Sequence, residues 1–167
     1  MAFVPELTVQ DLPAPPAGKT GWPWTEGSAV YPALRSDGSS WPSLRVVTPS
    51  YGQAEYLEET IRSVLLQGYP RLEYFVIDGG SKDGTVNILE KYDPWLSGWL
   101  SESDRGQVDA IKKGLAGAGT DYFTWINSDD LFEKDALQIF SFARNGRAVA
   151  GIVTNFTRYG VVEKKKN

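Results

Sequence analysis

The amino-acid sequence predicts an α/β fold with a doubly wound, mostly parallel sheet and helices on both faces. Short runs of β-branched and aromatic residues alternate with segments of helical periodicity, which is the pattern of βαβ units. The chain has 167 residues, which is enough for one domain with a sizeable core and too few for two ordinary ones. These two observations predict a single α/β domain.

Each element follows from its own pattern. Runs rich in apolar, β-branched and aromatic residues predict strands at residues 44–48, 72–78, 95–100 and 122–126, and the start of a fifth at 148–154. The first strand is expected to be buried on both faces if it is central. Apolar residues at helical spacing predict helices at 55–67, 83–92, 107–118 and 133–143. Asp83 is expected to cap the second helix, and Val108, Ile111 and Leu115 are expected to share one side of the third.

Three segments are expected along the chain. Residues 1–43 form an arm rich in proline and tryptophan, and its tryptophans are expected to pack on the domain. Residues 44–155 form the α/β domain that binds the ligand, and residues 156–167 form a short strand or basic tail.

Composition excludes several classes of function. The net charge of -4 and the lack of a basic stripe argue against nucleic acid as a partner. The chain has no cysteine and no histidine, so acid–base chemistry would fall to carboxylates. Residues 1–11 lack the basic and apolar pattern of a secretory signal, so none is expected, and no run approaches the roughly 20 apolar residues that would span a bilayer. We therefore expect a soluble cytoplasmic protein without an integral membrane segment, whose Lys164–Lys166 run could touch acidic lipid at the membrane periphery.

Polar clusters follow the predicted strands at the point where each strand ends. They occupy residues 48–51, 78–81, 101–106 and 127–130 and are rich in Asp, Ser and Gly. In an open α/β sheet, ligands bind in the crevice beyond the carboxyl ends of the strands. We therefore expect these clusters to meet at one acidic, glycine-lined pocket that suits a metal-bridged phosphate ligand.

Each cluster also has a simpler explanation. Asp129 and Asp130 together suit Mg²⁺ or Mn²⁺ shared with substrate phosphates, although one of them could merely cap the next helix. Tyr51 could stack on a base or stand at an ordinary strand exit. Arg105 could contact a diphosphate or form a surface ion pair, and the segment from Asp78 could be a turn with an N-cap.

Taken together, these clusters resemble the family-two inverting glycosyltransferases with the GT-A fold. The resemblance runs from about residue 41 to residue 143. It is carried by VTPSY at 47–51, IDGGSKDGT at 77–85, SDRGQVDAIKKG at 103–114 and WINSDDL at 125–131. The blocks occur in the family's order and at about its spacing.

The resemblance implies roles for residues of the nucleoside pocket. Thr48, Pro49 and Tyr51 would line this pocket, and Asp78 with Gly79 would lie near the base and ribose. Many members carry two aspartates where this chain has Asp78 and Gly79, so the contact to the base edge departs from the family pattern.

The resemblance also implies roles at the diphosphate and the metal. Arg105 and Asp109 belong to the block that approaches the diphosphate and donor sugar, in which a lysine replaces an amide common in the family. Asp129 and Asp130 match the family's Asp-x-Asp-like motif for Mn²⁺ or Mg²⁺. Asp130 would be the direct ligand, with Asp129 nearer the ribose or sugar.

The catalytic base is left unassigned. Family members usually continue for many tens of residues past the metal motif, into a half that builds the acceptor site and carries the base. After Asp130 this chain offers only Glu133, Asp135 and Glu163, none of which fits. The donor half is expected to be complete and the acceptor half missing, and an open sheet edge could then drive formation of a homo-oligomer.

The expected function is transfer of a sugar, with inversion, from a nucleotide-diphosphate sugar to a hydroxyl acceptor in polysaccharide or glycoconjugate synthesis. A UDP-sugar is the expected donor, and the acceptor is unknown. The alternative is a non-catalytic or truncated module that binds nucleotide sugars. A sugar nucleotidyltransferase is disfavoured, because residues 49–53 do not form a basic, glycine-rich loop.

Overall fold

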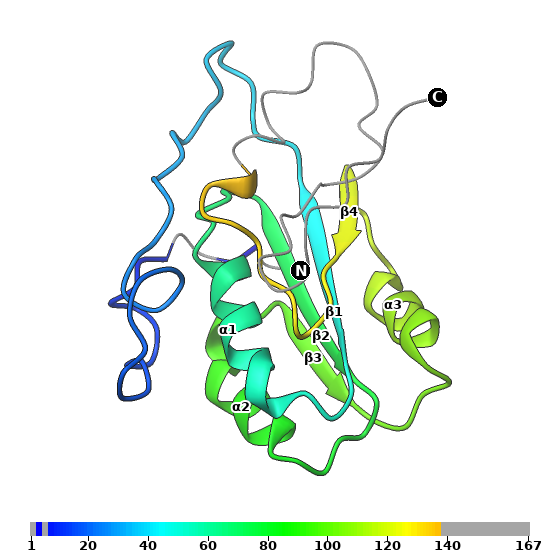
Figure 1. Cartoon of the computed structure of the whole chain (residues 1–167). Helices are drawn as coiled ribbons and strands as arrows, with labels where there is room; N and C mark the ends of the chain where they lie inside the picture. The colour runs from blue at the N-terminus through cyan, green and yellow to red at the C-terminus, as the bar shows by residue number, and fades with distance from the viewer. Residues whose placement is uncertain (1–2, 5–6, 138–167) are drawn as a thin grey trace, which may run out of the picture.

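The computed structural model describes residues 3–4 and 7–137 and shows a four-stranded parallel sheet. The strands lie in the order β3-β2-β1-β4 (Figure 1). Their bounds are β1 Leu44–Ser50, β2 Leu72–Asp78, β3 Gly98–Ser101 and β4 Tyr122–Trp125. The chain runs outward from β1 to β3 and then returns to the other side of β1, so the strand order reverses between β1 and β4.

The two central strands are buried because parallel sheets are covered on both faces. Every residue of β1 is buried, and β1 pairs with β2 from Leu44 opposite Leu72 to Ser50 opposite Asp78. This register brings the carboxyl ends of the two strands level. The polar clusters that follow them therefore start at the same edge of the sheet.

Helices cover both faces of the sheet, as the sequence predicts. Helices α1 (Ala54–Leu65) and α2 (Thr85–Tyr92) lie on one face, and α3 (Gln107–Leu115) lies on the other (Figure 1). The predicted apolar face of α1 is confirmed, since its side chains are fully or almost fully buried: Leu57, Ile61, Val64 and Leu65. Asp83 accepts hydrogen bonds from Thr85 at the start of α2, and also from the main-chain N–H of Ala54 at the start of α1.

Helix α3 contacts the sheet mainly through small residues, and of the predicted apolar face Leu115 packs against the buried cluster of Val47, Ile77 and Ala110. Ala110 and Gly114 are its buried residues, whereas Val108 is 66% exposed. A Cβ atom added at Gly114 would lie 2.5 Å from Val47 Cγ1. The helix lies so close to β1 that larger side chains would not fit between them. It also ends at Leu115, three residues before the predicted end.

The outer strands differ from their predicted bounds. Residues 93–95 form a short 3-10 helix, because Pro94 cannot donate to a sheet ladder, and β3 begins only at Gly98. Strand β4 ends at Trp125, one residue early, and it leaves Phe123 and Trp125 more than half exposed. Residues 133–135 are not helical, so the predicted fourth helix does not begin at Glu133.

Residues 7–43 contain no helix or strand and pack on the domain through aromatic side chains. Trp24, Tyr31 and Trp41 are buried. The fully buried Arg62 of α1 donates to the carbonyl oxygens of Pro13, Pro23 and Trp24 at 2.9–3.0 Å and so fixes the segment to α1.

Several predicted elements lie outside the described residues. These are the remainder of the helix at 133–143, the strand at 148–154 and the segment at 156–167. Within the described part of the chain, the helices are too short or too polar to cross a lipid bilayer.

Candidate functional site

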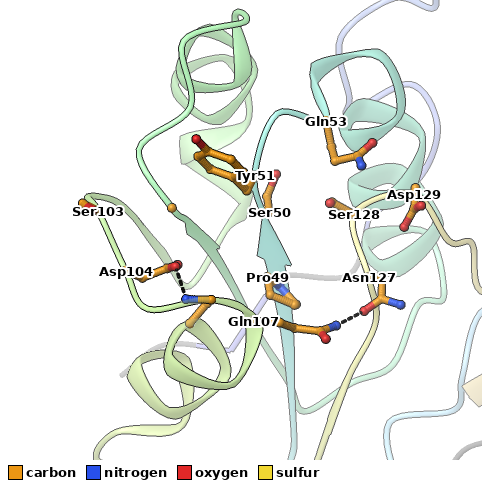
Figure 2. Close-up of a pocket in the computed structure, with 13 residues that line it drawn as sticks. Pro49, Ser50, Tyr51, Gln53, Ser103, Asp104, Gln107, Asn127, Ser128 and Asp129 are labelled. Carbon is orange, nitrogen blue, oxygen red and sulfur yellow. Dashed lines mark hydrogen bonds between the residues drawn. The ribbon is translucent and has the colours of Figure 1, made fainter.

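A pocket of about 500 Å³ opens at the carboxyl ends of β1 and β4, where the strand order reverses. This is the place at which open α/β sheets bind ligands, and the volume is in the range of small-molecule sites. Figure 2 shows side chains from the loops after β1, β3 and β4 around it. The lining residues are Pro49, Ser50, Tyr51, Gln53, Gly79, Ser103, Asp104, Gly106, Gln107, Ala110, Asn127, Ser128 and Asp129.

The end of β1 forms the back of the pocket. Pro49 and Ser50 are the last residues of the strand, and the next residue, Tyr51, lines the pocket and is 72% exposed. The hydroxyl oxygen of Ser50 is buried and has no hydrogen-bond partner within the described residues. A buried hydroxyl without a partner is costly, so a ligand that reached it would gain a hydrogen bond.

The loop after β2 is held in place by Asp78. Its carboxylate is fully buried and accepts hydrogen bonds from the main-chain N–H of Gly80 and Ser81 and from the hydroxyls of Ser81 and Ser101. Its oxygens are therefore occupied by the chain itself, and Asp78 does not line the pocket. The residue that does reach the pocket from this loop is Gly79, whose N–H donates to the Ser50 carbonyl at 2.9 Å.

Gly79 allows a close approach between the loops after β1 and β3. A Cβ atom placed on it would lie 3.1 Å from Asp104 Oδ2 and 3.1 Å from Tyr51 Cδ2. These contacts are tighter than ordinary van der Waals contact. A larger residue at this position would push the aromatic ring and the carboxylate apart.

The start of α3 forms another wall. Asp104 Oδ1 accepts a hydrogen bond of 2.7 Å from the N–H of Gly106, which has a φ of 103° and directly precedes the helix (Figure 2). Gln107, the first helical residue, lines the pocket and donates to the side-chain oxygen of Asn127. The positive end of the helix dipole thus lies at the pocket, where it favours an anion.

Arg105 and Asp109 lie beside the pocket but do not line it. The Arg105 side chain is 88% exposed and forms an i,i+4 ion pair of 2.9 Å with Asp109. Hydrogen bonding from Arg105 lowers the pKa of Asp109. The alternative of a surface ion pair describes Arg105 in this structure better than a diphosphate contact does.

The two acidic residues after β4 lie in different environments. Asp129 is exposed and lines the pocket. Asp130 does not line it and accepts a 3.0 Å hydrogen bond from the Asn127 side chain. Burial raises the pKa of Asp130, the hydrogen bond from Asn127 opposes this, and the charge of Asp129 adds to it. Thr60 Oγ1 lies 2.8 Å from the carbonyl oxygens of both Ser128 and Asp130 and so fixes the turn to α1.

The charge of the pocket lining is negative. The side chains of Asp104 and Asp129 line it, and no lysine or arginine is among the lining residues. The described residues contain no group of three or more carboxylates that could hold a metal by themselves. A hard cation such as Mg²⁺ often takes only one or two protein carboxylates and completes its shell with phosphate oxygens and water. Asp129 fits that kind of site.

The structure brings together only part of the predicted site. Pro49, Tyr51, Gly79 and Asp129 line the pocket. The predicted site residues that do not line it are Thr48, Asp78, Arg105, Asp109 and Asp130. Thr48 is fully buried, with its hydroxyl 2.9 Å from that of Tyr74. Side chains on β1 alternate between the two faces, which places Thr48 on the face opposite Pro49.

Sequence reasoning missed several lining residues. Five of them fall inside the polar clusters that follow the strands: Ser103, Asp104, Gly106, Asn127 and Ser128. The clusters indicated where the pocket lies, but they did not show which of their residues face it. Gln107, at the start of α3, falls inside the block at 103–114 that carries the family resemblance, but it was not assigned a role there. Gln53, which directly precedes α1, lies outside both the polar clusters and the resemblance blocks.

Known proteins resemble more than half of this chain. An uncharacterized glycosyltransferase of Mycobacterium tuberculosis is 39% identical over 95 residues, which are 56% of this chain and 36% of that protein. The Bacillus subtilis protein TuaG, named for teichuronic acid biosynthesis, is 36% identical over 104 residues, which are 60% of this chain and 41% of that protein. The chain therefore spans about two fifths or less of the length of these relatives.

Solved structures show the same fold. The Pyrobaculum calidifontis mannosyltransferase in complex with GDP-Man and Mn²⁺ matches with a TM-score of 0.55 and 25% identity over 62% of this chain and 33% of its own. TarS of S. aureus also matches with a TM-score of 0.55 and 25% identity, over 65% of this chain and 23% of its own. The fold is the GT-A fold of glycosyltransferases. The sequence profile of Glycosyl transferase family 2 matches residues 45–166, and the chain belongs to this family.

Proposed function

We propose that the pocket binds the nucleoside diphosphate of an activated sugar together with Mn²⁺ or Mg²⁺, and that the chain is the donor-binding part of an inverting glycosyltransferase. One observation supports this most strongly. The pocket lies at the strand-order reversal and combines an acidic side chain, Asp129, with the positive end of α3. The Mn²⁺ and GDP-Man in the Pyrobaculum mannosyltransferase agree with it.

The diphosphate belongs at the end of the pocket where Asp129 and Asn127 lie, next to the side chain of Gln107 from the first turn of α3. A diphosphate cannot approach Asp129 alone, because both are negative. A divalent cation between them would supply Lewis-acid stabilisation of the charge on the departing diphosphate. Gln107 stands at the amino end of α3, where main-chain N–H groups orient toward an anion. The side chain of Gln107 in turn holds Asn127 by a hydrogen bond.

Asp130 acts in this scheme by positioning rather than by direct coordination. Its hydrogen bond from Asn127 and the contact of its carbonyl with Thr60 fix the turn that presents Asp129. This revises the expectation that Asp130 is the direct ligand. The reason is that its carboxylate is partly buried and already accepts a hydrogen bond, whereas that of Asp129 is exposed at the pocket.

The reaction would be a direct displacement at the anomeric carbon. The acceptor hydroxyl attacks the face opposite the diphosphate and loses its proton to a base, while the diphosphate leaves with the bonding electron pair. The catalytic base lies outside the pocket in this scheme, because the two carboxylates that line the pocket, Asp104 and Asp129, both serve to bind the donor. The relative named for teichuronic acid biosynthesis supports a polysaccharide hydroxyl as acceptor.

Calorimetry with UDP and GDP tests donor binding. We expect binding in the presence of Mn²⁺ and a loss of about tenfold or more in affinity when EDTA removes the metal. Asp129→Asn should lose this metal-dependent part, because an amide does not neutralise the cation. Glu55→Gln is the matched control, since Glu55 is exposed on α1 and does not line the pocket.

Metal-independent binding that Asp129→Asn leaves unchanged would contradict the proposal.

A second assay measures the release of UDP or GDP from a panel of nucleotide-sugar donors. Release separates a transferase from a module that binds nucleotide sugars without turnover.

A further inference from the structure

We propose that Asp104 reads the base of the donor nucleotide and selects a base with an imino N–H, uracil or guanine, over cytosine and adenine. The inference rests on the proposed function, because it concerns the other end of the same pocket. The geometry that carries it is the free oxygen of Asp104 beside the ring of Tyr51, across a glycine.

The two carboxylate oxygens of Asp104 have different surroundings. Oδ1 accepts the hydrogen bond from Gly106 that shapes the start of α3. Oδ2 faces Gly79 and takes part in no hydrogen bond with the described residues. Asp104 is partly exposed and lines the pocket, so Oδ2 is an acceptor available to a ligand.

Gly79 is required at this position by space rather than by backbone conformation. Its φ lies outside the left-handed region, so another residue could adopt the same backbone. Its missing side chain lets Tyr51 and Asp104 approach each other across the loop. An aromatic surface with an acceptor beside it matches a nucleobase, which has a flat π face and polar edges.

The distribution of charged residues along the pocket places Asp104 at the end where the nucleobase would bind. Figure 2 shows Tyr51 and Asp104 on one side of the pocket, and Asn127 and Asp129 on the other. No basic side chain lines either side. If the cation and the diphosphate occupy the Asp129 side, the nucleoside extends toward Tyr51. Asp104 then meets a neutral group, which avoids repulsion between a carboxylate and a phosphate.

A carboxylate discriminates between bases by their edges. Uracil carries an N–H donor at N3 and guanine carries donors at N1 and N2, and either can donate to Oδ2. Cytosine at N3 and adenine at N1 present lone pairs instead. These bases could donate to Oδ2 only from their amino groups, N4 and N6, and the neighbouring lone pair would then lie close to the negative charge. A site built to accept a hydrogen bond rejects a ligand that lacks the donor, because its own polar group is left unpaired.

The test is calorimetry of UDP, GDP, CDP and ADP in the presence of Mn²⁺. The wild-type protein should prefer UDP or GDP over CDP and ADP by about tenfold or more. Asp104→Asn keeps an oxygen for Gly106 and replaces the free acceptor with an NH₂ donor. We expect its preference to shrink below about threefold.

The matched control is Glu102→Gln, which removes the same charge two residues away. Glu102 forms a 2.8 Å ion pair with Lys113, is half exposed and does not line the pocket. This variant should keep the wild-type preference.

A methylated ligand provides a second test. In 3-methyluridine diphosphate or 1-methylguanosine diphosphate, the methyl group replaces only the N–H that is proposed to donate to Asp104. The methylated ligand should bind the wild type about tenfold more weakly than the parent, and bind Asp104→Asn nearly as well as the parent.

The outcomes separate two failures. Equal affinity of the wild type for the four diphosphates would overturn the role of Asp104 and leave the proposed function standing. An equal loss of affinity for UDP, GDP, CDP and ADP in Asp104→Asn would also overturn the role of Asp104 and leave the proposed function standing. Absence of binding by any diphosphate would overturn the proposed function, and the inference with it.

Discussion

Asp78 organises the pocket although it does not line it. Its buried carboxylate gathers two main-chain N–H groups and two hydroxyls around one point, and this fixes the loop that carries Gly79. The carboxylate is the right group here because it accepts several hydrogen bonds and donates none. We infer that Asp78 is a positioning residue for the nucleoside end of the pocket.

Asp78→Asn tests this role at nearly constant volume. The amide NH₂ would face donors, so at least one buried N–H or hydroxyl would lose its acceptor. We expect a loss of about 1–3 kcal/mol in the free energy of unfolding, measured by urea denaturation. Asp37→Asn is the control, because Asp37 accepts hydrogen bonds from Ser39 in an exposed turn, and it should change stability by less than about 0.5 kcal/mol. Equal stability of the two variants would contradict the positioning role.

Helix α3 links the sheet to the pocket. Ala110 and Gly114 bring the helix close to β1, and its amino end then forms one wall of the pocket. The sequence predicted this helix and its position after the third strand. It predicted only part of the contact face: Leu115 packs on the core as expected, whereas Val108 is exposed. Apolar periodicity points to large side chains, but the close contact with β1 is made by small ones.

Gly114→Ala tests the close contact between α3 and β1. Alanine favours a helix by about 1 kcal/mol over glycine. The added Cβ would lie 2.5 Å from Val47 Cγ1, however, and overpacking costs about 1–3 kcal/mol. We expect a net loss of stability in thermal and urea unfolding. Gly119→Ala is the control, since nothing lies within 4 Å of its added Cβ and its φ is not left-handed. A Gly114→Ala protein as stable as this control would contradict the packing described.

The whole molecule shows which features a sequence can predict. Parallel strands end at one edge of the sheet, so the clusters after β1, β2, β3 and β4 could be placed together from their order alone. The sequence could not predict, however, which way each of these side chains points. Thr48 and Asp78 face inward because hydrogen bonds with distant segments, with Tyr74 and Ser101, help to hold them there. Arg105 turns to Asp109 through a local i,i+4 ion pair, which competes with a contact to a ligand.

The irregular arm gives a second example at this scale. Its tryptophans predicted packing, but the buried guanidinium of Arg62 that binds three of its carbonyl groups left no mark in the sequence. A helical arginine is ordinarily read as solvent-exposed. Long-range contacts of this kind set the final shape around a sheet whose outline the sequence predicts.

A crystal structure of the protein with Mn²⁺ and the more tightly bound of UDP and GDP tests the central claim most directly. We predict an anomalous manganese peak beside the Asp129 carboxylate, bridged to the diphosphate, with the base against Tyr51 and its edge on Asp104. A nucleotide bound elsewhere on the molecule, or a manganese peak away from Asp129, would contradict it.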